Sequence, residues 1–196
     1  MDWQLSALSG YVLGSVSWAV IIGKLALHAD IRRRGSGNAG GANVGRVVGI
    51  AWGVLVSLLD VGKGALAAAV GVRLSGGDVR GGMVAGTAAV VGHMLPIWFG
   101  FRGGKSIATF AGVCAVVAPN MIVPAAAAWV LAYALVRTVA RASAVAAAML
   151  PVVGFGVGAT SDQIIYLAAV GYAISMRHMP EAVGGGRRFR PRRRLK

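Results

Sequence analysis

Apolar residues occur along the chain in long runs, and short segments between them hold most of the charged residues. A transmembrane helix needs about 20 predominantly apolar residues to cross the hydrocarbon core. The runs show neither the alternation of a β-strand nor the polar stripe of a soluble surface helix. The pattern predicts an all-α polytopic integral membrane protein with about seven transmembrane helices. We place them at residues 7–27, 47–72, 82–100, 106–119, 121–137, 143–160 and 162–177.

The fourth and fifth runs meet at Ala118, Pro119 and Asn120, so the pattern allows two short spans or one broken span. Composition supports a membrane location. The 196 residues are 57% hydrophobic and 13% charged, and the mean hydropathy is +0.70. About a quarter of the residues of a soluble domain are charged. The single cysteine, Cys114, lies in an apolar run, and we expect neither a metal site nor a cofactor.

The net charge of +14 is distributed unevenly between the two sides that seven spans create. Arginine and lysine favour the cytoplasmic side of a membrane. The segments after spans one, three and five and the C-terminal tail are basic, whereas the other side holds only Arg73 and Arg80. The asymmetry places the N-terminus outside and the C-terminus in the cytoplasm of a bacterial cytoplasmic membrane. Every conspicuous polar motif then lies on the cytoplasmic face.

The domain organisation follows from the same pattern. Residues 1–178 form a single transmembrane domain, and residues 179–196 form a basic tail that we expect to be disordered and to contact anionic lipid headgroups. Aromatic residues do not accompany the basic ones, so we expect no nucleic-acid partner. The sequence is compatible with a monomer and leaves the oligomeric state open.

The segment RGSGNAGGANVGR, which ends at Arg46, combines many glycines with polar donors. Glycines free the backbone for turns whose N–H groups can surround an anion. Ser36, Asn38 and Asn43 add side-chain donors beside Gly37, and the guanidinium of Arg46 suits phosphate oxygens. A plain flexible loop is the alternative. We favour a site for a phosphorylated metabolite.

The segment FGFRGGKSIATF is not a nucleotide P-loop, because the first glycine of that motif would fall at Phe99. It can still bind an anion. Gly103 and Gly104 allow a backbone turn that points N–H groups toward a ligand. Lys105 precedes a predicted helix whose N-terminus favours negative charge. His93 lies deeper in the membrane, where an interhelical hydrogen bond is the simpler interpretation.

Asp60 and Lys63 are three residues apart within a predicted span, so they share a helix face. Charged residues inside a membrane are costly and must be paired or functional. We interpret them as a structural ion pair that supports the site, with a proton or ion path as the alternative. Ser143 and His178, each beside a predicted span end, are weak signals by themselves.

The blocks GSGNAGGANVGR, LLDVGKG and GHMLPIWFGFRGGKSIAT, in this order and spacing, resemble the bacterial acyl-phosphate-dependent glycerol-3-phosphate acyltransferases. The resemblance covers residues 10 to 178. It implies transfer of a fatty acyl group from acyl phosphate to the 1-hydroxyl of glycerol 3-phosphate, giving lysophosphatidate and phosphate, a step of phospholipid synthesis. It also implies seven spans, an external N-terminus and a cytoplasmic site.

By position, the resemblance assigns glycerol phosphate binding to the loop of Gly103, Gly104 and Lys105. Arg46 and Lys105 would hold phosphate. Because acyl phosphate is already activated, no covalent enzyme nucleophile is required, and the enzyme neutralises charge and aligns the reactants. The residues that would orient the reactants or carry the proton are Ser36, Ser143 and His178.

The sequence departs from the family pattern at several positions. Ala42 replaces a threonine, Ser17 replaces a proline, and Glu181 stands where an asparagine is usual. The second serine near Ser143 is also replaced by alanine. These departures leave a divergent paralogue as the alternative, one that binds a phosphorylated ligand without catalysis or transports it.

Overall fold

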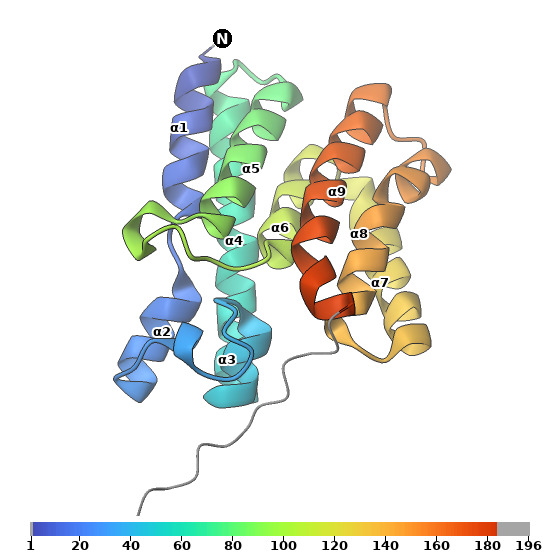
Figure 1. Ribbon diagram of the computed structural model, residues 1–196. Helices are drawn as coiled ribbons and strands as arrows, with labels where there is room; N and C mark the ends of the chain where they lie inside the picture. The colour runs from blue at the N-terminus through green and yellow to red at the C-terminus, as the bar shows by residue number, and fades with distance from the viewer. Residues whose placement is uncertain (1, 184–196) are drawn as a thin grey trace, which may run out of the picture.

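The computed structural model describes residues 2–183, and every regular element in that range is helical (Figure 1). Side chains are described through residue 179. The α-helices are α1 (Trp3–Gly14), α2 (Trp18–Leu27), α3 (Gly41–Val47), α4 (Ile50–Leu74), α5 (Val79–Met94), α6 (Ile107–Val117), α7 (Ile122–Val136), α8 (Val139–Gly156) and α9 (Ser161–Val183). The short 3-10 helices are η1 (Ile31–Arg33), η2 (Ile97–Phe99) and η3 (Pro119–Met121).

Five segments of the described chain are long and apolar enough to cross a bilayer. They are Trp3–Leu27, Ile50–Leu74, Val79–Phe99, Pro119–Val136 and Val139–Gly156. The fourth predicted span corresponds to α6, whose 11 residues extend about 16 Å, well short of the roughly 30 Å hydrocarbon core. The last predicted span lies in α9, which has 23 residues and a more polar composition. The all-helical membrane class is confirmed, and the count of seven remains a prediction.

The first predicted span is not one continuous helix. Helix α1 ends at Gly14 and α2 begins at Trp18, so the residues between them leave backbone groups without helical partners. Such groups must be satisfied inside the protein, because lipid offers no hydrogen bonds. Lys63 of α4 donates from Nζ to the carbonyl oxygen of Val16 at 2.6 Å. The buried lysine therefore stabilises the break.

Small residues allow α1 and α5 to approach closely. A Cβ atom at Gly10 would collide with the backbone of Ala85, and one at Gly14 with the backbone of Ala89. The spacing of these glycines matches the small-xxx-small pattern of membrane helix interfaces. The packing of α1 on α5 holds these two helices side by side in the upper part of Figure 1.

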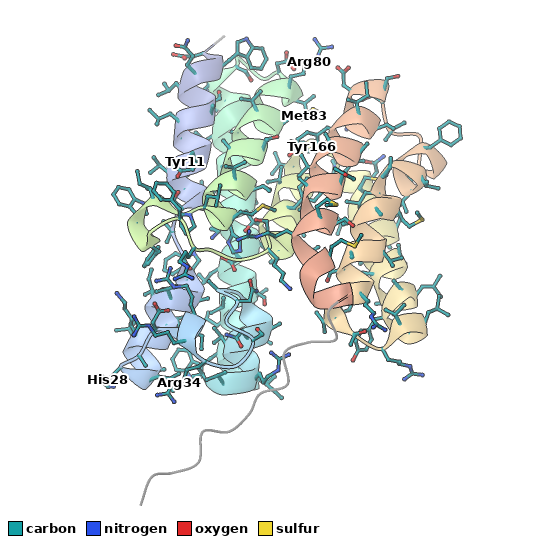
Figure 2. All side chains as sticks on the ribbon, in the orientation of Figure 1. Tyr11, His28, Arg34, Arg80, Met83 and Tyr166 are labelled. Atoms are coloured by element: carbon teal, nitrogen blue, oxygen red, sulfur yellow. The ribbon has the colours of Figure 1, made fainter. Side chains whose placement is uncertain are left out.

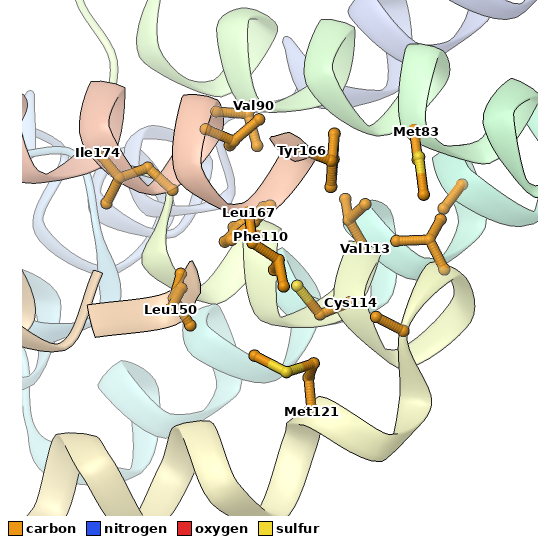
Figure 3. Close-up of a cluster of buried hydrophobic side chains, with 14 of the residues drawn as sticks. Met83, Val90, Phe110, Val113, Cys114, Met121, Leu150, Tyr166, Leu167 and Ile174 are labelled. Carbon is orange, nitrogen blue, oxygen red and sulfur yellow. The ribbon is translucent and has the colours of Figure 1, made fainter. Parts of the chain in front are cut away.

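Two groups of helices meet along a buried apolar cluster (Figure 3). Helix α8 packs against both α7 and α9, and the remaining helices gather around α4. Phe110 and Cys114 of α6 belong to this cluster together with Val90 of α5 and Leu167 of α9. A smaller cluster around Val20, Ile31 and Val44 joins α2, η1, α3 and α4. It holds the loop that follows α2 against the rest of the protein.

The predicted boundary between the transmembrane domain and the tail, at residue 178, falls inside α9. The helix continues to Val183, five residues further along the chain. The prediction that the tail is disordered concerns mainly residues 184–196, which lie outside the described residues.

Candidate functional site

A cavity of about 320 Å³ lies where two loops meet the end of α9. The first loop follows η1, the second follows η2, and both were selected from the sequence as anion-binding segments. Seven residues line the cavity: Ser36, Gly37, Asn38, Gly103, Lys105, Met176 and Arg177. Two of these described lining residues are cationic and none carries a carboxylate. The lining therefore suits a negatively charged ligand.

The first loop is shaped by Asn43, whose side chain is 1% exposed. Its Nδ2 donates to the carbonyl oxygens of Ile31 at 3.2 Å and Arg34 at 3.1 Å, and its Oδ1 accepts from the N–H of Ser36 at 2.8 Å. Glycine is required at position 35, where φ is +58° and a Cβ atom would collide with Oδ1 of Asn43. In the structure the amide of Asn43 organises the backbone that carries Ser36. Its role in binding substrate stays a prediction.

The second loop packs tightly against the end of α5. The N–H of Gly103 donates to the carbonyl of Met94 at 3.1 Å, and that of Gly104 to the carbonyl of His93 at 3.0 Å. A Cβ atom at Gly104 would collide with Nε2 of the buried His93. The expectation that these two N–H groups turn toward a ligand is wrong, because they cap α5. The glycines serve instead to bring Lys105 close to α5.

Helix α6 begins at Ile107, two residues after Lys105 and one residue after the predicted start of that span. Its N-cap is Ser106, which has φ of +67° and donates from Oγ to the carbonyl of Val90 at 2.9 Å. The N–H groups of Ser36 and Gly37 are also used within the protein, by Oδ1 of Asn43 and the carbonyl of Arg34. The predicted backbone anion nest is therefore not formed by these residues. The cationic side chains of the lining are the candidates for recognition of an anionic ligand.

Arg177 is a cavity residue that is not among the site residues predicted from the sequence. It precedes His178 on α9, and it is exposed. The signal was available, because residue 177 ends the last predicted span on the same side as both loops. The lining combines Lys105 and Arg177, whereas Arg46 is not among its described residues.

Arg46 lies on α3, three residues after Asn43, so both residues are on one side of that helix. Arg46 is exposed, and Asn43 holds the first loop. Ser143 and His178 are buried at 3% and 4% exposure. Ser143 Oγ accepts from Trp129 Nε1 at 3.1 Å, which ties α8 to α7. Neither residue is among the described residues that line the cavity.

His178 is oriented by its own helix. Nδ1 lies 2.9 Å from the carbonyl oxygen of Ile174, one turn earlier on α9. A carbonyl oxygen only accepts, so Nδ1 carries the proton in this contact. Nε2 of the neutral imidazole is then the basic nitrogen. The arrangement gives His178 a defined tautomer beside the cavity residue Arg177.

Asp60 and Lys63 form a buried ion pair, with 2.8 Å between Oδ1 and Nζ. His93 of α5 joins them, because its Nδ1 lies 2.8 Å from Nζ of Lys63 and 3.6 Å from Oδ1 of Asp60. Three segments are thereby connected: the α1–α2 break through Val16, α4, and α5. The imidazole of His93 packs so closely on Gly104 that a Cβ atom there would collide with Nε2. The network therefore lies directly behind the second loop.

The two ends of the molecule differ in their polar contacts. Arg34, in the first loop, and Arg80 lie at opposite ends of the molecule (Figure 2). Arg80 and Asp162 form an exposed ion pair at 2.6 Å between α5 and α9. Two features define the class of protein: helices apolar enough to cross a membrane, and a cavity lined by cationic side chains. This is an integral membrane protein with a site suited to a phosphate-bearing group.

The chain belongs to the glycerol-3-phosphate acyltransferase family. A sequence model described as glycerol-3-phosphate acyltransferase matches residues 4–183. A protein of that name from Jannaschia sp. (strain CCS1) is 38% identical over 174 residues, which are 89% of this chain and 84% of the relative. One from Pseudomonas paraeruginosa is 44% identical over 146 residues, 74% of this chain and 76% of the relative.

Solved structures agree with the sequence comparison. The crystal structure of PlsY (YgiH), an integral membrane glycerol 3-phosphate acyltransferase, in its glycerol 3-phosphate form has a TM-score of 0.85 to this chain. Sequence identity is 33%, and the match covers 94% of both chains. The lysophosphatidic acid form of PlsY has a TM-score of 0.82 and 32% identity, over 94% of this chain and 93% of that one. The alternative of a non-catalytic or transport paralogue is not favoured.

Proposed function

We propose that this protein transfers a fatty acyl group from acyl phosphate to the 1-hydroxyl of glycerol 3-phosphate. The observation that carries the proposal is the cavity in which Lys105 and Arg177 face a ligand space together with Ser36 and Asn38. Side-chain donors of this kind form charge-assisted hydrogen bonds with phosphate oxygens. The substrates named for the PlsY structures and the family membership support the same reaction.

The reaction needs no covalent intermediate on the protein. The 1-hydroxyl oxygen attacks the carbonyl carbon of acyl phosphate, a new C–O ester bond forms, and the C–O bond to phosphate breaks. Inorganic phosphate leaves with the bonding electrons. The hydroxyl proton passes to a phosphate oxygen or to His178, whose Nε2 is the basic nitrogen. Much of the rate enhancement comes from holding the hydroxyl oxygen against the carbonyl carbon in the orientation for attack.

Two phosphate groups meet in this reaction, so more than one cation is required. We assign Lys105 and Arg177 to the cavity itself. We assign Arg46, which lies on α3 three residues after Asn43, as a third cation for the second phosphate group. The hydroxyls of Ser36 and Ser143 would orient the reactants. Gly37, Asn38 and Gly103 line the cavity around them, and the buried Gly104 supports this lining from behind Gly103.

The proposed topology has seven spans, with α6 and α9 counted as the short and the more polar members. Helix direction in Figure 1 supports an odd number, since the chain starts at the end opposite the loops and α9 ends near them. Basic residues concentrate at the loop end of the described chain. The site would then face the cytoplasm from a bacterial cytoplasmic membrane, with residues 1–178 acting as one domain. The acyl phosphate donor and surrounding lipids would enter from the bilayer.

The deciding experiment measures phosphate release by the purified full-length protein in detergent. Palmitoyl phosphate is supplied with and without glycerol 3-phosphate, and lysophosphatidate is identified by mass spectrometry. We expect release that depends on glycerol 3-phosphate and falls at least a hundredfold in Lys105→Ala. Folded protein that binds palmitoyl phosphate but releases no phosphate would overturn the proposed reaction.

A further inference from the structure

Arg32 and Asp30, which precede the first loop in the sequence, form an ion pair that we call the bracket. Nη2 of Arg32 lies 2.8 Å from Oδ2 of Asp30, and Nε donates to both carboxylate oxygens at 3.0 and 3.1 Å. The N–H of Arg32 also donates to Oδ1 of Asp30 at 2.9 Å. The side chains are 21% and 23% exposed. The carboxylate therefore holds the guanidinium in one orientation.

The remaining edge of the Arg32 guanidinium reaches the second loop. Its Nη1 donates to the carbonyl oxygens of Phe99 at 2.6 Å and Arg102 at 2.9 Å. These carbonyls are separated from Arg32 by about 70 residues of sequence. The guanidinium thus bridges the two segments that supply most of the cavity lining.

Each of the two loops is already fixed within itself. Asn43 holds the first loop from inside, and the N–H groups of Gly103 and Gly104 bind the second to α5. Ser36 follows Arg32 by four residues, and Lys105 follows Arg102 by three. A bridge between these short segments sets the separation of Ser36 from Lys105.

We propose that Arg32, oriented by Asp30, is a positioning residue for the acceptor site. It holds the two loops at the separation that lets Ser36 and Lys105 bind one glycerol 3-phosphate phosphate group. The inference rests on the proposed function of the cavity. Arg32 acts on the site indirectly, because it is not among the described residues that line the cavity and its guanidinium binds Asp30 and the two carbonyls.

The bridge requires arginine rather than any cation. A planar guanidinium donates along two edges at once, whereas a lysine ammonium is a single point with three donors. Arg32→Lys keeps the charge and loses the fixed geometry. Arg33 is the matched control, since it is the adjacent arginine and is exposed. Arg33→Ala removes the same charge without removing the bracket.

The test measures KM for both substrates, kcat and glycerol 3-phosphate binding by calorimetry, on full-length protein in detergent. We expect Arg32→Ala and Arg32→Lys to raise KM and Kd for glycerol 3-phosphate at least tenfold. KM for palmitoyl phosphate should stay within about twofold of wild type, and Arg33→Ala should match wild type. Guanidinium chloride at low millimolar concentration should restore part of the affinity of Arg32→Ala.

Three results would overturn the inference: unchanged glycerol 3-phosphate affinity in Arg32→Ala, an equal loss for both substrates, or an equal loss in Arg33→Ala. If Arg32→Ala does not fold, Asp30→Asn and Arg32→Lys decide the question by the same measurements. Binding also separates the two proposals. A wild-type protein without turnover refutes the acyl transfer, while the ranking of the Kd values still tests the bracket.

Discussion

The ammonium nitrogen of Lys63 lies 2.8 Å from Nδ1 of His93, which joins α4 to α5 behind the second loop. An ammonium group only donates, so Nδ1 accepts and neutral His93 keeps its proton on Nε2. Nε2 in turn lies against Gly104, where a Cβ atom of any other residue would collide with it. Membrane charges that look isolated in the sequence therefore support the loop that carries Lys105.

Lys63→Met should destabilise the protein strongly. The change leaves Asp60 as an unpaired buried charge and removes the ammonium group that donates to the Val16 carbonyl. Breaking a buried pair in this way lowers the free energy of unfolding by about 3–5 kcal/mol. For a chain of this size that corresponds to a fall in Tm of about 6 °C or more in detergent. Asp60→Asn together with Lys63→Met should recover part of the loss. Lys24→Met, at an exposed lysine of α2, is the control, and an equal effect there would contradict the role of the ion pair.

Gly104→Ala should weaken acceptor binding. The added methyl group would collide with Nε2 of His93 and with the carbonyl of Ala39, so the second loop must shift and carry Lys105 with it. We expect KM for glycerol 3-phosphate to rise at least tenfold, measured by acceptor-dependent phosphate release. Gly62→Ala is the matched control, because a Cβ atom there meets nothing within 4 Å. Equal kinetics in the two variants would show that close packing at residue 104 is unimportant.

Arg177→Ala should reduce kcat/KM for glycerol 3-phosphate by about 10- to 100-fold. A charge-assisted hydrogen bond to phosphate contributes about 1.5–3 kcal/mol, and Arg177 is one of the two cations in the lining. Arg73→Ala, at an exposed arginine in the last turn of α4, serves as the control. A normal kcat/KM in Arg177→Ala would remove this residue from the phosphate site.

The bracket should persist to low pH. The hydrogen bond from Arg32 holds the pKa of Asp30 below its ordinary value of 3.8. A lowered folded-state pKa stabilises the folded state fully above the unfolded value, and this contribution is lost as the pH falls through the folded value. The Tm difference between wild type and Asp30→Asn should therefore be constant at neutral pH and down to about pH 5, and should shrink below about pH 4. A difference that disappears between pH 7 and 5 would contradict this assignment.

Much of the architecture could be predicted from local sequence. Long apolar runs are costly to expose to water and cheap to place in lipid, so five spans agree with the predicted ranges. The spacing of Gly10 and Gly14 is likewise a local signal for a close helix contact, which α5 provides. The break after Gly14 was not predictable in this way. It depends on Lys63, which lies 47 residues after Val16, the residue whose carbonyl it binds.

The sequence by itself determined the class of protein, the two glycine-rich loops and the chemistry of their side chains, because these depend on residue types and short spacings. Only the tertiary structure decided which donors remain for a ligand. Asn43 and the N–H groups of Gly103 and Gly104 are consumed by backbone carbonyls, while Arg177 of α9 completes the cavity. Arg32 became a bridge for the same reason: hydrogen-bond partners are chosen by proximity in space, and residues 32 and 102 meet only when the helices pack.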